Sequence, residues 1–145
     1  MGEVLSLSQI RMPGTARTKD DAIREAGQIL VGAGAVTPDY IDSMFDRERS
    51  VSTYMGNYLA IPHGTNESKE SIKRSALSVI RYLDPIDWDG NEVLFALGIA
   101  GYQGGHMDIL SRIAIVFSDT DEVDKLVAAG SAQELYDLLN AVNQQ

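Results

Sequence analysis

Cysteine is absent from this 145-residue chain, and basic residues are few. Without cysteine, the chain can form no disulfide, no thiolate metal site and no thiol nucleophile. Lysine and arginine total 12 against 21 aspartate and glutamate residues, which gives a formal net charge of −9. Proteins that bind nucleic-acid phosphates or an anionic membrane surface need an excess of positive charge, so this balance disfavours both functions.

Long apolar runs are missing as well. No run approaches the roughly 18 residues of a membrane-spanning helix, so we expect none. Residues 1–19 are mixed and polar, which differs from the basic start and apolar stretch of a signal peptide. These features favour a cytoplasmic protein. With 44% apolar and 23% charged residues the composition is that of a globular chain, and we expect residues 1–145 to form a single domain.

Hydrophobic spacing predicts strands interspersed with helices. Helices are expected over residues 18–32, 37–49, 66–74, 107–117, 121–129 and 131–142. Strands are expected over residues 58–61, 76–83 and 92–100, with an edge strand before Pro13-Gly14. Turns are expected at Asp84-Pro85 and at Asp89-Gly90. This order, without internal repeats, predicts an α/β fold: a single layered domain in which helices flank a mixed central β-sheet.

Three of the expected helices begin with residues that favour a helix start. Thr18 precedes two acidic residues in the first turn, and Ser131 with Glu134 forms a capping box. Thr37 is expected to cap the second helix, with Pro38 in its first turn.

Only two histidines occur, His63 and His106, and each follows glycine or proline near the end of an expected strand. Strand ends and loops are where α/β domains place functional side chains. Pro62 and Gly64 flank His63, which would present its imidazole at a rigid corner. Imidazole can act as a base, a metal ligand or a nucleophile. The alternative is a loop histidine without a function.

Motifs for several other chemistries are missing. Asp108 is the only carboxylate close to a histidine, and no H-E-x-x-H sequence occurs, which disfavours a metal-dependent hydrolase. There is no G-x-S-x-G of a serine hydrolase. There is also neither a Walker A sequence nor G-x-G-x-x-G. We therefore expect no metal and no cofactor, and any phosphate must be received from another molecule.

Four segments together resemble a known family. Residues 56–65, Gly-Asn-Tyr-Leu-Ala-Ile-Pro-His-Gly-Thr, resemble the active-site segment of the A component (enzyme IIA) of the bacterial sugar phosphotransferase system, mannitol/fructose class. Three more segments match in order and spacing: Asp46-Arg47-Glu48, Leu97-Gly98-Ile99-Ala100 and His106-Met107-Asp108-Ile109-Leu110. The resemblance covers roughly residues 5–143.

Within this class, residues 84–90 favour the mannitol branch. Fructose-specific relatives and nitrogen-regulatory relatives share the histidine motif. The alternative is therefore a fructose-specific or nitrogen-regulatory IIA-like protein that acts as a phosphorylation-dependent regulatory module; the nitrogen-regulatory type has no transporter partner.

The resemblance implies a phosphoryl relay. In this family phosphoenolpyruvate phosphorylates enzyme I, which passes the group to HPr and then to the A component. His63 would accept the phosphoryl group from HPr and pass it to a cysteine of the cognate IIB component. Arg47 corresponds to the family's active-site arginine and His106 to its second histidine.

Thr65 could donate a hydroxyl near His63, and a helix starting near Asn66 would direct N–H groups towards an anion. Each supporting residue also has a structural alternative. Arg47 could be an exposed cation at a helix end, His106 a polar residue at a helix N-terminus, and Thr65 a helix cap.

Overall fold

The computed structural model describes residues 4–65, 70–102 and 105–140. Its centre is a five-stranded mixed sheet with the strand order β1-β4-β5-β3-β2. The strands are β1 (Ile10–Arg11), β2 (Tyr54–Gly56), β3 (Leu59–Ala60), β4 (Ala76–Trp88) and β5 (Asn91–Ala100). β1 pairs in parallel with β4, and β3 pairs in parallel with β5, whereas β4 and β5 form a long antiparallel hairpin.

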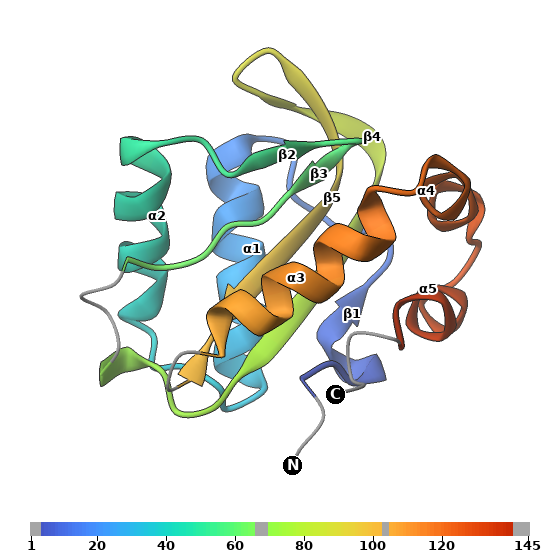
Figure 1. Ribbon diagram of the computed structural model, residues 1–145. Coiled ribbons are helices and arrows are strands. Elements are labelled where there is room, and N and C mark those ends of the chain that lie inside the picture. The colour runs from blue at the N-terminus through green and yellow to red at the C-terminus, as the bar shows by residue number, and fades with distance from the viewer. Residues whose placement is uncertain (1–3, 66–69, 103–104, 141–145) are drawn as a thin grey trace.

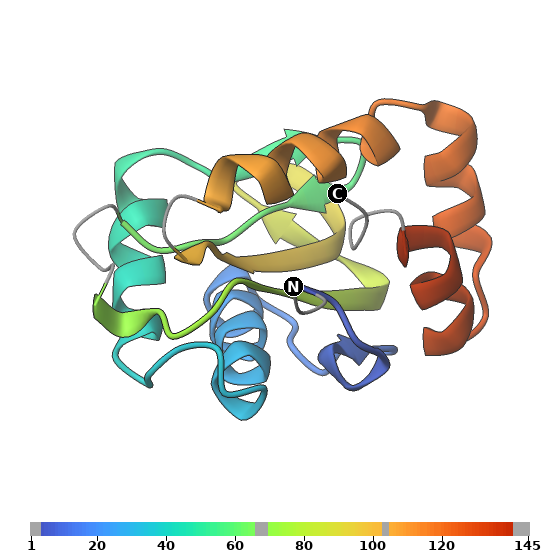
Figure 2. The ribbon, with the colours of Figure 1, turned by 60° about the horizontal axis from the view of Figure 1, so that its bottom comes forward.

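Helices cover both faces of this sheet (Figures 1 and 2). After a 3₁₀ turn (Leu7–Gln9), the helices are α1 (Lys19–Gly32), α2 (Tyr40–Ser50), α3 (His106–Phe117), α4 (Thr120–Ala128) and α5 (Ala132–Leu139). α1 and α3 lie on opposite faces of the sheet. α4 and α5 follow α3 and lie near the edge of the sheet that is formed by β1. The predicted α/β class, with a mixed central sheet flanked by helices, is confirmed.

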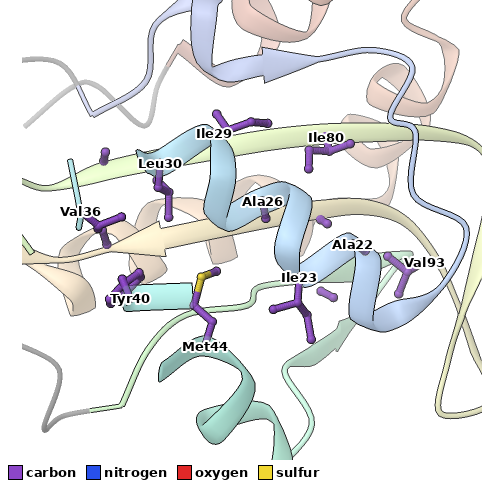
Figure 3. Close-up of a cluster of buried hydrophobic side chains, with 14 of the residues drawn as sticks. Ala22, Ile23, Ala26, Ile29, Leu30, Val36, Tyr40, Met44, Ile80 and Val93 are labelled. Atoms are coloured by element: carbon purple, nitrogen blue, oxygen red, sulfur yellow. The ribbon is translucent and has the colours of Figure 1, made fainter. Parts of the chain in front are cut away.

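Alternation along the strands divides the apolar core in two, because successive side chains of a strand point to opposite faces. Val79 and Leu97 pack in one cluster with α3, α4 and α5. Ile80 and Ala96 pack in the other cluster with α1 and α2. Figure 3 shows this second cluster, in which Ala26 of α1 lies over the sheet.

α1 approaches the sheet closely because Gly98 of β5 has no side chain. A Cβ atom on Gly98 would lie 2.5 Å from Ser78 Oγ and 3.1 Å from the Cβ of Ala26. The helix begins as predicted, since the Thr18 hydroxyl accepts the backbone N–H of Asp21 at 3.2 Å. Small residues on both elements therefore set the distance between α1 and the sheet.

Other predicted elements are confirmed with small shifts of their ends. An edge strand precedes Pro13, and the capping box of α5 forms, with Ser131 Oγ accepting the Glu134 N–H at 3.2 Å. The turn between β4 and β5 lies at Asp89 and Gly90, which both have positive φ, 55° and 92°. No helix within the described ranges is long and apolar enough to cross a membrane.

Three sequence predictions are wrong. Thr37 does not cap α2, which begins at Tyr40; its hydroxyl donates to the Asp39 carboxylate instead. No turn forms at Asp84-Pro85, because a register irregularity between Arg81 and Ile86 accommodates the proline within β4.

The third error concerns the helix predicted over residues 66–74. Its first four residues lie outside the described part of the chain. In residues 70–74, Ile72 forms an antiparallel bridge with Val36 rather than part of an α-helix. β2 was not predicted from the sequence.

Candidate functional site

His63 lies where the chain continues past β3 alongside β5. Its backbone forms a parallel bridge with Ile99, and the Ile99 N–H donates to the Pro62 carbonyl at 3.0 Å. Only 7% of the residue is exposed. The imidazole therefore lies at the carboxyl ends of two parallel strands, the location where open α/β sheets place their ligands.

A backbone carbonyl determines the tautomer of this imidazole when the ring is neutral. Nδ1 of His63 lies 2.7 Å from the carbonyl oxygen of Ile61. A carbonyl can only accept a hydrogen bond, so Nδ1 carries the proton of the neutral ring. The lone pair of the neutral ring is therefore on Nε2.

Tyr40, in the first turn of α2, fixes the backbone next to the histidine. Its hydroxyl donates to the Ile99 carbonyl at 2.7 Å and accepts the Gly64 N–H at 2.8 Å. Burial raises the pKa of Tyr40 to about 12, although the hydrogen bond from Gly64 lowers it in part. The hydroxyl therefore keeps its proton at neutral pH and can make both bonds.

Ser43, one turn further along α2, holds Thr65. Its Oγ accepts the Thr65 N–H at 2.8 Å and lies 3.1 Å from the Thr65 hydroxyl. One face of α2 thus binds both residues that follow His63. The alternative role predicted for Thr65, capping a helix that starts near Asn66, falls on residues outside the described ranges.

Arg47 lies in the last turn of α2. Its Nη1 donates to the carbonyl of Val51 at 2.8 Å. This contact fits the structural alternative of a cation at a helix C-terminus. It uses one of the five N–H donors of the guanidinium group, and the others suit a phosphate.

His106 is the first residue of α3. The preceding strand, β5, pairs with the segment that carries His63 and ends at Ala100. The side chain of His106 lies outside the described part of the structure. Its role as the second histidine of the site stays a prediction.

An acidic groove of about 600 Å³ lies beside Thr65. The lining residues are Thr37, Asp39, Asp42, Ser43, Asp46, Thr65, Glu70 and Ser71. Four carboxylates in this set give the groove a negative potential, which complements a basic protein surface rather than a free anion. Within residues 4–65, 70–102 and 105–140, no three His, Asp or Glu side chains gather as metal ligands.

Tyr40 and Ser43 were not predicted from the sequence as parts of the site. Helical spacing alone places Tyr40 on the apolar face of its helix. A signal was present, because a buried tyrosine hydroxyl requires a hydrogen-bond partner. The position of that partner, 24 residues along the chain at Gly64, cannot be read from spacing.

Comparison with known proteins identifies the family of this chain. A family model described as the phosphoenolpyruvate-dependent sugar phosphotransferase system, EIIA 2, matches residues 3–142. A mannitol-specific phosphotransferase enzyme IIA component of Halalkalibacterium halodurans is 50% identical over 141 residues, covering 97% of each chain. The component of the same name from Staphylococcus aureus is 47% identical over 135 residues, covering 93% of this chain and 94% of that protein.

Solved structures give the same result. The crystal structure of IIA mannitol from Escherichia coli has a TM-score of 0.86 at 30% identity, covering 93% of this chain and 98% of that one. Enzyme IIAMTL of Escherichia coli, in its complex with phosphorylated enzyme IIBMTL, has a TM-score of 0.87 at 29% identity, covering 94% and 96%. The chain therefore belongs to the EIIA 2 family of the phosphoenolpyruvate-dependent sugar phosphotransferase system and is a phosphotransferase component.

Proposed function

We propose that this protein carries a phosphoryl group on Nε2 of His63, accepts it from phospho-HPr and passes it to a cysteine of a IIB component that serves mannitol uptake. The observation that carries the proposal is the hydrogen bond from His63 Nδ1 to the Ile61 carbonyl at the ends of β3 and β5. Relatives named mannitol-specific support the sugar, and the Escherichia coli complex with phosphorylated IIBMTL supports the acceptor.

The chemistry needs no proton transfer before attack. The Nε2 lone pair of His63 attacks phosphorus in line, and the new P–N bond forms as the P–N bond to the HPr histidine breaks. The electron pair of the broken bond stays on the HPr ring. Positive charge that develops on the His63 ring is stabilised by the Nδ1–H···O bond to Ile61. In the second transfer, a thiolate of IIB attacks the same phosphorus and the pair returns to Nε2.

Three further side chains support this transfer in the proposal. Arg47 binds equatorial phosphoryl oxygens through its remaining donors, His106 supplies a second imidazole, and the Thr65 hydroxyl donates next to His63. Arg47 would have to reorient its guanidinium group from the Val51 carbonyl or use donors that this contact leaves unused.

Radiolabelled phosphoenolpyruvate, enzyme I and HPr test the proposal on wild type and on His63→Ala. We expect one acid-labile, alkali-stable label per wild-type chain, dependent on HPr and absent from His63→Ala. The circular dichroism and melting temperature of the variant show that it is folded. No label on wild type, in a mixture that labels a known IIA component, would contradict the proposal.

A second candidate is a regulatory module. The nitrogen regulatory protein IIA-Ntr of Neisseria meningitidis has a TM-score of 0.82 at 28% identity, covering 94% of this chain and 96% of that one. Transfer from the labelled protein to a mannitol IIB domain, compared with a fructose IIB domain, separates the two functions and names the sugar class. The proposal also treats residues 1–145 as one domain that works in the cytoplasm.

A further inference from the structure

We propose that Glu48 is a positioning residue for the phosphoryl transfer, whose buried carboxylate aligns the His63 imidazole with the end of α2 that carries Arg47. The inference deepens the proposed function and depends on His63 being the phosphoryl acceptor. Three sets of contacts support it: those of the carboxylate, those that lead from it to His63, and those that hold the helix end.

The Glu48 carboxylate is buried, since the residue is only 6% exposed, and both of its oxygens accept hydrogen bonds. Its Oε2 accepts the Thr53 N–H at 3.0 Å and the Trp88 Nε1–H at 3.2 Å. Its Oε1 accepts the Thr53 hydroxyl at 2.5 Å, and Lys19 Nζ lies 3.3 Å from Oε2. Such a carboxylate fixes the Thr53 N–H and the Trp88 Nε1–H firmly, because both would be left unsatisfied in a buried place without it.

Thr53 connects this carboxylate to the histidine. The Thr53 carbonyl accepts the Ile61 N–H at 3.1 Å, which extends the pairing of β2 with β3. The Ile61 carbonyl in turn accepts the Nδ1–H of His63 at 2.7 Å. Three successive hydrogen-bond steps therefore lead from Glu48 to the imidazole, through residues that are all buried.

The same carboxylate holds the C-terminal end of α2 in place. Trp88, fully buried at the end of β4, and Lys19, at the start of α1, both bind Glu48. Arg47 is the adjacent residue in this helical turn, and its guanidinium group contacts Val51, two residues before Thr53. Glu48 thus sets the position of the backbone that carries Arg47 relative to the segment that carries His63.

This arrangement matters for phosphoryl transfer because the reaction depends mainly on positioning. The nucleophile must lie in line with phosphorus while a cation binds the equatorial oxygens. Displacements of about 1 Å from the productive geometry can cost on the order of 100-fold in rate. A residue that holds both the nucleophile and the cation affects the rate without touching the phosphoryl group.

A second buried carboxylate provides a matched control. Glu25 is 4% exposed and accepts hydrogen bonds from Arg11, the Thr15 backbone, the Thr15 hydroxyl, the Ala16 backbone and Tyr82. These partners lie in residues 11–16 and in β4, so Glu25 holds a segment other than β2 and β3. Glu25→Gln and Glu48→Gln make the same chemical change at similar burial.

The test combines single-turnover transfer from phospho-HPr with ¹⁵N NMR of the His63 ring in the unphosphorylated protein. Each variant is studied at a temperature at which it is fully folded. We expect Glu48→Gln to slow transfer at saturating phospho-HPr by about 10-fold. The half-saturating concentration of phospho-HPr stays near that of wild type. The ring resonances shift towards a mixture of the two tautomers. Thr53→Val, which removes only the hydroxyl donor, shifts both readouts in the same direction by less and serves if Glu48→Gln does not fold.

Glu25→Gln is expected to lower stability while leaving the transfer rate and the ring resonances of His63 unchanged. Equal effects of the two glutamine variants, or wild-type ring resonances in both Glu48→Gln and Thr53→Val, would overturn the inference. Failure of the proposed function is distinguishable, since wild type would then accept no phosphate or His63→Ala would still be labelled. The ring resonances test the hydrogen-bond path in either case.

Discussion

The hydroxyl oxygen of Tyr40 lies 2.8 Å from the backbone nitrogen of Gly64, so a residue in the first turn of α2 fixes the residue that follows the proposed phosphoryl acceptor. The same hydroxyl donates to the carbonyl of Ile99 in β5. One side-chain atom therefore joins the helix layer, the sheet and the loop that follows His63. The position of the imidazole depends on the packing of α2 as well as on the sheet.

Replacing Tyr40 with Phe removes both hydrogen bonds of this hydroxyl. The Gly64 N–H and the Ile99 carbonyl are left without that partner, so we expect a loss of about 1–3 kcal/mol in the free energy of unfolding. Phosphoryl acceptance should slow as well. Urea unfolding measures the first effect, with Tyr58→Phe as the control, because Tyr58 is 41% exposed. Unfolding of Tyr40→Phe at the wild-type urea midpoint would contradict the prediction.

Arg47 and Arg49 allow a matched comparison within the last turn of α2. Arg49 pairs on the surface with Asp46, whereas Arg47 is the proposed phosphate-binding residue. Arg47→Ala should lower the rate of phosphoryl acceptance by about 100-fold and Arg47→Lys by less, because lysine offers a point charge without the planar donors. We expect neither change from Arg49→Ala. Equal rates for the two alanine variants would remove Arg47 from the site.

Glu25 should make stability depend on acidity. Burial alone would raise the pKa of Glu25, but hydrogen bonds from Thr15, Arg11 and Tyr82 outweigh it and lower the pKa from 4.5 to about 2. The ionised carboxylate therefore stabilises the fold at pH values above 4.5, and this contribution is lost as the pH falls from 4.5 to about 2.

The stabilisation by Glu25 should amount to about 1–3 kcal/mol at neutral pH. Urea unfolding of wild type and Glu25→Gln at several pH values measures it. The difference between the two proteins should be greatest at neutral pH and should shrink below pH 4.5. A difference that does not change with pH would show that the carboxylate has the same pKa in the folded and unfolded chain.

Gly98 should tolerate no larger residue. A methyl group there would approach Ser78 Oγ to 2.5 Å and Ala26 Cβ to 3.1 Å, so Gly98→Ala should destabilise the fold by about 1–3 kcal/mol. Gly32, at the end of α1, has no atom within 4 Å of the corresponding position. Gly32→Ala should therefore be neutral or stabilise by up to about 1 kcal/mol. Thermal unfolding of both variants checks the pair, and a stable Gly98→Ala would mean that α1 can move away from the sheet.

Local signals explain how much of the fold was predictable. Capping by Thr18 and Ser131 marked two helix starts, and hydrophobic spacing identified α1, α3 and both central strands. The error at Asp84-Pro85 arose because tertiary pairing with β5 overrode a local turn signal. Local sequence cannot report whether a neighbouring strand will accommodate a proline in a bulge.

The candidate site, too, could be predicted from the sequence only in part. His63 was predicted because its flanking residues lie in one contiguous segment, residues 56–65, which by itself resembles the active-site segment of a known family. The contacts that surround it join Tyr40 to Gly64 and Glu48 to Trp88, which are 24 and 40 positions apart. Both side chains lie on buried parts of α2, where an apolar residue would fit the helical pattern equally well. Their function becomes visible only once the helix is placed against the sheet.

β3 consists of only two residues, and its place in the sheet depends on two pairs with β5 and on the bridge at His63. Leu59 and Ile61 pack in the cluster with α3, whereas Ala60 packs in the cluster with α1 and α2. Deleting or inserting one residue between Leu59 and Ile61 would exchange these faces and move the His63 imidazole to the other face of the sheet. The length of this segment is therefore a second requirement of the proposed phosphoryl-acceptor site.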